Sequence, residues 1–254
     1  RASLGAGLHD ERRRRRRSAR CERAQVEAEQ RQVDSELAQV TEQNQALQGS
    51  LLQLTFLHLR TVALATLAAT VVALSLAILV TRPGGREFLP LSRSVVNIGQ
   101  TFPPVAVLAL AVPAVGFGEA PTLIALFLYG LLPIFENAMT GLTGLPPAVV
   151  EAARGTGMTN WQRLWRVELP LALPVILAGI RLSVIIGLAT ATIGSTVAAR
   201  TLGEVIIAGL LSNNLAYIVQ GGLIVAVLAV LLSDLLSSAE RIVARRMGQA
   251  GRRG

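Results

Sequence analysis

The chain has 254 residues, of which 52% are hydrophobic and only 16% are charged, and its formal net charge is +8. Its mean hydropathy is +0.52. This composition is too apolar and too poor in charge for a typical soluble domain, so it indicates an integral membrane protein.

The first 56 residues are predicted to form a basic, helical N-terminal extension. Six consecutive arginines occur within residues 11–17, and apolar residues then recur every seven positions from Val26 to Leu54. The repeat predicts an amphipathic helix or a short coiled coil over 24–54, although Gln30 and Asn44 weaken its seam. The alternative is a disordered basic tail without a specific role. Because the chain starts at Arg1, we expect a fragment or a misplaced start.

Five apolar segments follow, each long enough for the roughly 20 residues that a bilayer span needs. They cover 61–80, 94–115, 120–140, 171–199 and 205–233. Prolines and glycines in the fourth predict that part of it is broken or re-entrant. The fifth is expected to cross from about Tyr217, after a short helix and turn over 201–214 outside the membrane. The expected fold is therefore an all-α polytopic membrane domain over 57–241 with a basic tail over 242–254.

Arginines flank these spans on alternate sides. They lie at 82–86, at 154–166 and at 241–253, whereas the opposite loops near 116–121 and 201–214 carry only Glu119 and Glu204 as charges. The positive-inside rule places the three basic segments in the cytoplasm. With five spans, the arginine run at 11–17 then lies outside, although its charge favours the cytoplasm, anionic lipid or nucleic acid. One further span upstream would remove the conflict.

The most informative segment is EAARGTGMTNWQRLWRVELP, from Glu151 to Pro170. Pro146 and Pro147 suit the start of a helix, which Gly155 and Gly157 should end. Thr159 and Gln162 have the spacing of a capping box, so a second short helix is expected over 160–167.

On this second helix Trp161 and Trp165 share a face, with Leu164 beside them, while Arg163 and Arg166 point elsewhere. The predicted element is a helix-turn-helix with an aromatic face and a basic flank. The alternative is an ordinary amphipathic loop at the membrane interface, where Trp and Arg are common.

No catalytic or metal centre is predicted. Cys21 is the only cysteine, His9 and His58 lack ligand spacing, and there is no phosphate-binding or dinucleotide-binding glycine motif. The chain is therefore expected not to be an enzyme and to hold no cofactor. Any ATPase that drives it is expected to be a separate chain.

The segment resembles the EAA loop of ABC importer permeases. That family has Glu-Ala-Ala, three residues, Gly, nine residues, Ile, any residue and Leu-Pro. Six residues here match in register, and Val167 stands where isoleucine is usual. The matching residues are Glu151, Ala152, Ala153, Gly157, Leu169 and Pro170.

The sequence around the loop is similar to the sequences of the permeases for glycine betaine, carnitine and choline. The similar stretches are IGQTFPP at 98–104, FLYGLLPIFENAMTGL at 127–142, ARGTGMT and LPLALPVILAGIR. The resemblance extends over about 57–241. Glu136 occupies a region where that family often has an arginine, a departure that bears on substrate preference.

The resemblance implies a type I importer fold, a bacterial cytoplasmic membrane and three protein partners: an ATP-binding subunit, an extracytoplasmic substrate-binding protein and a second permease chain. The lipid bilayer is the other expected partner, and nucleic acid is not. The loop would couple to the ATPase through an inserted helix. The implied coupling residues are Glu151, Ala152, Ala153, Arg154, Gly155, Gly157, Trp161, Leu164 and Trp165.

Polar and ionisable residues within the spans are candidates for the substrate path because their exposure to lipid is costly. These candidates are Asn97, Gln100, Thr101, Tyr129, Glu136, Asn137 and Thr190. The alternative for the amides and threonines is that they only bridge helices. Glu136 would attract a quaternary ammonium or pair with Arg181, and Arg181 would snorkel or pair with a carboxylate.

Aromatic residues make up only 4% of the chain, too few for a cation–π cage, so tight recognition is expected on the binding protein. Two other functions stay open. One is a permease for another solute, such as methionine, taurine or nitrate. The other is a membrane-anchored scaffold that acts through its arginine-rich N-terminus.

Overall fold

The computed structural model describes residues 30–31 and 50–247, and these contain helices and no β-strand. The chain divides into two compact units, 1–53 and 54–254. The predicted helix over 24–54, the arginine run and Cys21 lie mostly or wholly outside the described residues. The main elements are the Ser50–Thr81 helix, η1 (Arg86–Phe88), α2 (Leu89–Thr101), α3 (Pro104–Val115), α4 (Glu119–Thr143), α5 (Pro147–Gly155), α6 (Asn160–Arg163), η2 (Leu164–Glu168), α7 (Leu169–Ile193), η3 (Gly194–Val197), α8 (Gly203–Leu211) and α9 (Leu215–Arg246).

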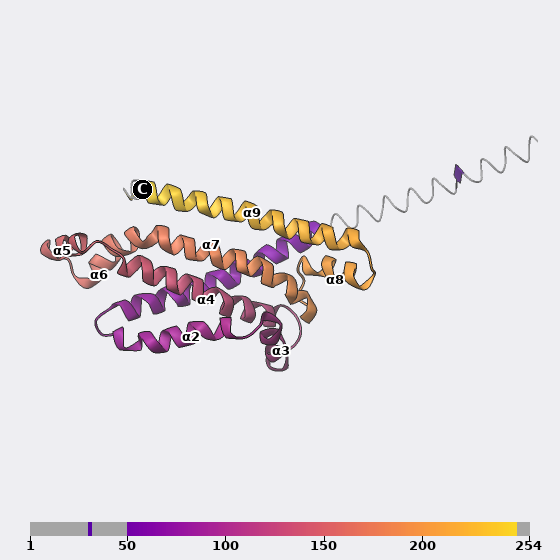
Figure 1. The fold of residues 1–254 in the computed structure, drawn as a ribbon, viewed down its shortest axis with the longest axis horizontal. Helices are drawn as coiled ribbons and strands as arrows, with labels where there is room; N and C mark the ends of the chain where they lie inside the picture. Colours follow the sequence, from indigo (N-terminus) through magenta and orange to yellow (C-terminus); the bar gives the residue numbers. More distant parts are fainter. Residues whose placement is uncertain (1–29, 32–49, 248–254) are drawn as a thin grey trace, which may run out of the picture. The chain divides into compact units, whose positions relative to one another are not determined.

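The long helices of the second unit lie side by side in the order α9, α7, α4 and α2 (Figure 1). Among the described residues, four helices are long and apolar enough to span a membrane, and the bent pair α2–α3 makes five if it counts as one span. The prediction of an all-α protein with about five spans is confirmed. The expected boundary between residues 56 and 57 falls within the Ser50–Thr81 helix and stays a prediction.

The break in the bundle lies in the second apolar segment, for which no break was predicted. Between Arg86–Thr101 and Pro104–Val115 the helix axis bends by 98°. Phe102 and Pro103 are extended there, with ψ of 144° and 146°. Two successive prolines explain the break, because each lacks a backbone N–H and each disfavours helical geometry in the residue before it.

The fourth segment, by contrast, is not broken or re-entrant, so that expectation is wrong. A single helical stretch runs over Asn160–Val197, and α7 continues through Pro174 and its glycines. The glycines allow close packing instead. A Cβ atom at Gly179 would lie 2.7 Å from both the Cβ of Asn137 and the carbonyl oxygen of Pro133 on α4. Among the elements from η1 to α9, the α4–α7 contact is the most extensive.

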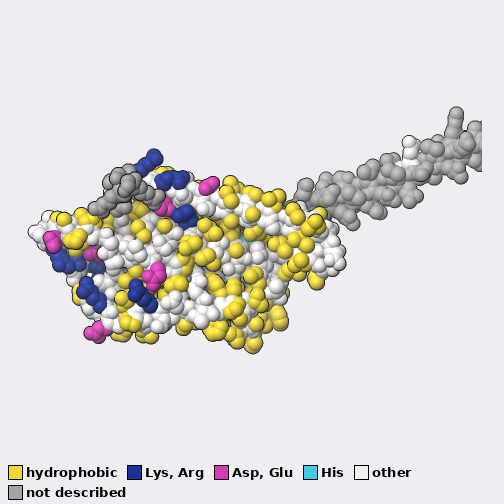
Figure 2. All heavy atoms as spheres, viewed as in Figure 1, with side chains coloured by type: hydrophobic (Ala, Val, Ile, Leu, Met, Phe, Trp, Pro, Cys, Tyr) yellow, Lys and Arg dark blue, Asp and Glu magenta, His cyan; other side chains and the backbone are white. Residues whose placement is uncertain are grey.

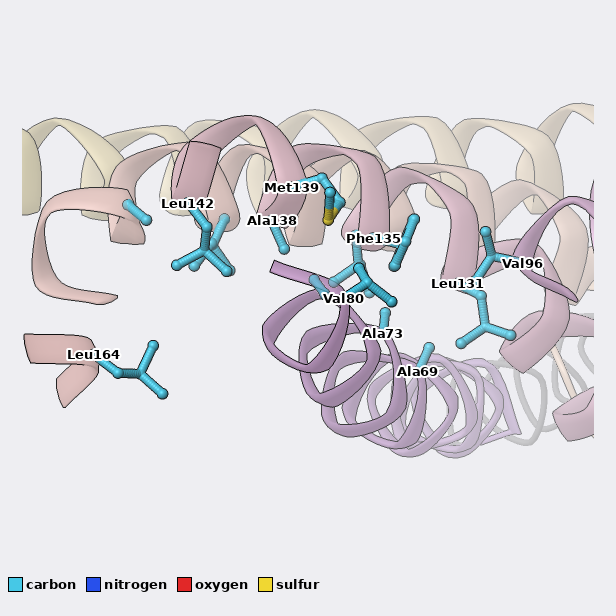
Figure 3. Close-up of a cluster of buried hydrophobic side chains, with 14 residues drawn as sticks. Ala69, Ala73, Val80, Val96, Leu131, Phe135, Ala138, Met139, Leu142 and Leu164 are labelled. Carbon is cyan, nitrogen blue, oxygen red and sulfur yellow. The ribbon is translucent and has the colours of Figure 1, made fainter. Parts of the chain in front are cut away.

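The largest hydrophobic cluster joins the Ser50–Thr81 helix to α4 and α7 (Figure 3). Ala65, Ala69, Ala73 and Ala77 recur every four residues on one face of the first helix and are almost completely buried. Such a stripe of small side chains lets two backbones approach closely, as is common between membrane helices. Phe135 on α4 lies against this stripe and is fully buried.

A short helix and a turn precede the last span, as the sequence predicts. The short helix α8 and a turn at Asn213, where φ is +51°, precede α9. α9 packs on α7 and α8, and its apolar window is only 6% buried within this single chain.

Candidate functional site

The loop between α4 and α7 contains two helical segments, as the sequence predicts. α5 starts at Pro147 and α6 starts at Asn160. The turn between them needs Gly157, whose φ of +80° is unfavourable for other residues, whereas Gly155 has an ordinary backbone conformation. The predicted capping box is confirmed, because the Thr159 hydroxyl accepts from the Gln162 N–H while the Gln162 amide oxygen accepts from the Thr159 N–H.

The second helix does not end at Val167, and this boundary was wrong. A π-helical turn, η2, joins α6 directly to α7, so the loop and the span form one helical stretch of 38 residues. Pro170 does not interrupt it and lies directly after the π-helical turn, in the first residues assigned to α7. Short π-helical turns within α-helices are frequent at functional sites.

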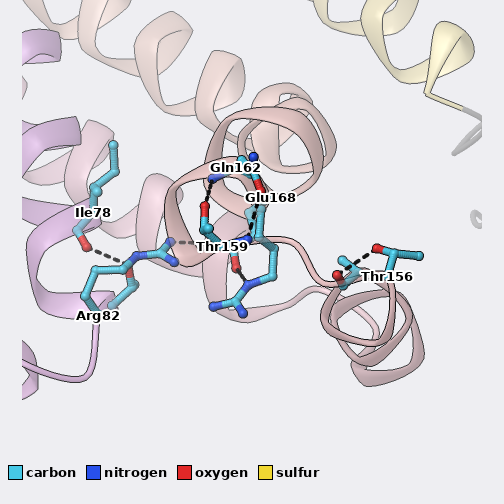
Figure 4. Close-up of polar contacts among 9 residues, drawn as sticks. Ile78, Arg82, Thr156, Thr159, Gln162 and Glu168 are labelled. Carbon is cyan, nitrogen blue, oxygen red and sulfur yellow. Dashed lines mark hydrogen bonds and ion pairs between the residues drawn. The ribbon is translucent and has the colours of Figure 1, made fainter.

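An ion-pair triad holds this turn against the first helix (Figure 4). The Glu168 carboxylate accepts from Arg163 Nε at 2.6 Å and from Arg82 Nη2. The side chains of Glu168 and Arg163 are 8% and 7% exposed, and that of Arg82 is 22% exposed. Since all three are largely removed from solvent, the two arginines depend on this one carboxylate for compensation.

The exposed face of the loop is smaller than the sequence suggested. Trp161 and Trp165 are 65% and 55% exposed, and their rings meet edge to face with centroids 5.5 Å apart. Leu164, expected beside them, is 2% exposed and belongs to the main hydrophobic cluster. Arg163 points into the triad and does not form part of a basic flank. Both differences follow from tertiary contacts, since Leu164 packs into the hydrophobic cluster and Arg163 pairs with the buried Glu168.

The other predicted coupling residues divide in the same way. Glu151, Ala152, Arg154, Gly155 and Gly157 are exposed, whereas Ala153 is 6% exposed and packs inward. Figure 2 shows arginine side chains gathered at the end of the bundle that carries α5 and the C-terminal end of α9. The described arginines of the three basic segments that flank the spans thus meet at one end. An aromatic pair and exposed charges there form a surface suited to binding another protein.

The predicted substrate-path residues do not form one cluster. Gln100 and Tyr129 support the α2–α3 break: Gln100 Nε2 donates to the Tyr129 carbonyl at 3.1 Å, and the Tyr129 hydroxyl donates to the Phe102 carbonyl. Thr101 donates to the Asn97 carbonyl within α2 at 3.1 Å. The alternative that Gln100 bridges helices is therefore the arrangement observed.

Glu136 and Asn137 lie about two turns further along α4. Glu136 faces Arg93, with 3.4 Å between Oε1 and Nε, and does not pair with Arg181. Arg181 instead pairs with Glu240 on α9 at 3.5 Å. Asn137 Nδ2 donates to the Pro133 carbonyl at 2.8 Å, and Thr190 is buried in α7.

Sequence analysis missed the triad as a unit. Arg82 was interpreted only as a topology marker, Arg163 as a topology marker and part of a basic flank, and Glu168 was not singled out. Glu168 lies between the apolar residues Val167 and Leu169, and a carboxylate at such a position indicates that it has a partner of opposite charge. The identity of that partner depends on contacts between residues 86 positions apart.

The sequence matches the family described as binding-protein-dependent transport system inner membrane component over residues 69–249. The chain is 41% identical to the osmoprotectant import permease protein OsmY of Salmonella typhimurium over 192 residues, which are 76% of this chain and 81% of that protein. It is 38% identical to the glycine betaine/carnitine/choline transport system permease protein OpuCB of Bacillus subtilis, with 77% and 89% covered.

Solved structures show the same fold. A chain of the inward-facing MetNI methionine ABC transporter is similar with a TM-score of 0.69 and 21% identity, with 76% of this chain and 96% of that chain covered. A chain of an amino acid ABC transporter solved with histidines is similar with a TM-score of 0.65 and 20% identity, with 77% and 95% covered. At these identities the likeness establishes the fold alone.

Proposed function

Because the chain belongs to the family of binding-protein-dependent transport system inner membrane components, we propose that it is the permease subunit of an ATP-driven importer of osmoprotectants. The proposed cargo is glycine betaine, choline, carnitine or a similar quaternary amine. The chain is a multi-pass transport subunit, not an enzyme. The proposed location is the bacterial cytoplasmic membrane.

The observation that supports this cargo best is the identity of 41% to an osmoprotectant permease across 76% of this chain. Relatives named for glycine betaine, carnitine or choline transport match at similar identity over similar lengths. The region that matches the family, residues 69–249, includes the loop between α4 and α7 and all the described elements from η1 to α9.

The proposed assembly has two permease chains, two ATP-binding subunits and an extracytoplasmic binding protein. The family description supports a binding protein. The exposed pair of Trp161 and Trp165, with Glu151 and Arg154 nearby, would dock on the ATP-binding subunit. Large aromatic side chains dominate the energetics of such interfaces. We assign Leu164 and Ala153 a packing role, since both are buried within this chain.

The continuous helix explains how docking would act on the transport path. Trp161 and Trp165 stand at the start of the helical stretch Asn160–Val197, and the triad fixes its π-helical turn to the first helix. A push on the aromatic pair would therefore move α7 as a rigid rod. Since α7 packs on both α4 and α9, its tilt would alternate access to the two sides of the membrane.

Uptake assays test the cargo. The complete system is expressed in a strain without other osmoprotectant importers, and uptake of labelled glycine betaine is competed by choline, carnitine and methionine. We expect competition by the quaternary amines and none by methionine. Methionine uptake with no response to the amines would overturn the proposed cargo, while loss of the permease gene without any effect on uptake would favour the scaffold.

The variant Gly157→Asp tests the coupling role. Aspartate tolerates the φ of +80° better than most residues, and no atom lies within 4 Å of the new Cβ position, so we expect normal membrane insertion. The added charge and strain should abolish transport-linked ATP hydrolysis. Gly84→Asp is the matched control, because Gly84 also has open space around it but lies outside the loop. Full transport by Gly157→Asp would remove the coupling assignment.

A further inference from the structure

A cavity of about 840 Å³ lies between the C-terminal end of α4, the first half of α7 and the C-terminal part of α9. It belongs to the end of the bundle that carries α5, since Gly144 and Pro146, which lead into α5, line its wall. None of the candidate docking or substrate-path residues lines it.

The cavity wall contains more positive than negative charge. Three guanidinium groups, of Arg181, Arg241 and Arg245, line it together with the single carboxylate of Glu240. Glu240 is engaged by Arg181 at 3.5 Å. The other two arginines are left without a carboxylate among the residues that the structure describes, so the cavity favours an anion.

Two of these arginines differ in how their donors are paired. Arg241 is held on α9 by bonds that its Nη1 donates to Ser237 Oγ at 2.7 Å and its Nη2 to Ser238 Oγ at 2.8 Å. The Nε atom of Arg181 is buried and has no hydrogen-bond partner among the described residues. A buried donor without an acceptor costs free energy that a ligand oxygen would recover.

Apart from Thr140 and Arg181, the lining from α4, α7 and the residues that follow α4 is apolar. It includes Leu145, just after α4, and Leu171, Val175 and Ala178 on α7. An occupant with both an anionic head and a hydrocarbon part satisfies both walls. On α9 the cavity begins at Ser237, just beyond the apolar run that ends at Leu232, which is the depth at which phospholipid headgroups meet a spanning helix.

We propose that this cavity binds the phosphate group of an anionic phospholipid, with Arg181, Arg241 and Arg245 as its ligands. Guanidinium groups bind phosphate oxygens in bidentate geometry, and basic pockets between spans are known to take lipid headgroups. Lipid binding at this site does not depend on the transported cargo, so it can be tested separately from the proposed function.

Native mass spectrometry of the full-length chain tests the site. The chain is titrated with phosphatidylglycerol and with phosphatidylcholine of the same acyl chains. We expect preferential binding of phosphatidylglycerol, weakened about five-fold for each arginine replaced by glutamine. Arg245→Gln is the main variant, because Arg245 is exposed and its loss leaves no buried charge unpaired. Arg241→Gln is the second variant.

Arg246→Gln is the matched control. Arg246 is exposed on the same helix but does not line the cavity, so its replacement should leave lipid binding unchanged. Equal binding of the two lipids, or equal losses in Arg245→Gln and Arg246→Gln, would overturn the site. Inorganic phosphate is titrated in a parallel arm. Phosphate binding as tight as lipid binding, with the same dependence on Arg245, would overturn the lipid source.

Discussion

The coupling loop and the α4–α7 contact are held together by opposite means. The loop relies on charges and caps: the Arg82–Glu168–Arg163 triad, a capping box and one glycine in a left-handed turn. The α4–α7 contact relies on small residues, with Gly179 against Asn137 and Gly141 against Ala172. One region is specified by a few polar partners and the other by close approach of two backbones.

This difference fits what each region has to do. Close packing gives a rigid span, because an interior at crystal-like density resists displacement. A loop fixed by a few buried charges keeps its aromatic residues outside, where a partner can reach them. Disruption of the two regions should therefore have different consequences, and three substitutions test that contrast.

Glu168→Ala should have the largest effect. Removal of the carboxylate leaves two poorly solvated guanidinium groups facing each other, which we expect to cost about 3–5 kcal/mol in the free energy of unfolding. Thermal unfolding in detergent measures the loss, and limited proteolysis should locate it at residues 147–170. Because Arg82→Gln removes one unpaired charge, adding it to Glu168→Ala should restore part of the stability.

Glu87→Ala serves as the control for that series. Glu87 is an exposed carboxylate of η1, close in sequence to Arg82, and its loss should leave the unfolding temperature unchanged. If Glu87→Ala and Glu168→Ala destabilise the protein equally, the triad does not hold the loop.

Trp161→Ala should separate docking from folding. The side chain is 65% exposed, so the unfolding temperature should stay the same. Loss of an aromatic anchor should weaken binding of the ATP-binding subunit by about 2 kcal/mol or more, roughly 30-fold. Phe117→Ala is a suitable comparison, since Phe117 is 74% exposed at the other end of α4. Equal affinity of Trp161→Ala and the unaltered chain would contradict the docking surface.

Gly179→Ala should destabilise the protein less than Glu168→Ala does. The added methyl would lie 2.7 Å from the Pro133 carbonyl oxygen, which cannot move without its helix, so we expect a loss of about 1–3 kcal/mol. Gly222→Ala makes the same change on α9, where nothing lies within 4 Å, and should be neutral or slightly stabilising. A similar unfolding temperature for both variants would show that α4 and α7 separate easily.

Much of the loop could be predicted because its signals are local. Pro147, the Thr159–Gln162 capping box and the two tryptophans four residues apart act within one or two turns of helix, and the structure places each as expected. The inward position of Leu164 could not be predicted. It depends on how the loop packs, because Leu164 joins a cluster of buried residues that come from the Ser50–Thr81 helix, α2, α4 and α7.

The sequence alone determined that this protein is a helical membrane permease, because apolar run length, charge asymmetry and loop motifs are properties of contiguous residues. Only the tertiary structure decided which apolar segment is broken and which charges pair. Glu136 faces Arg93 instead of Arg181, and Arg181 on α7 pairs with Glu240 on α9. Such pairings depend on distances between residues far apart in the chain, which are set when the helices pack.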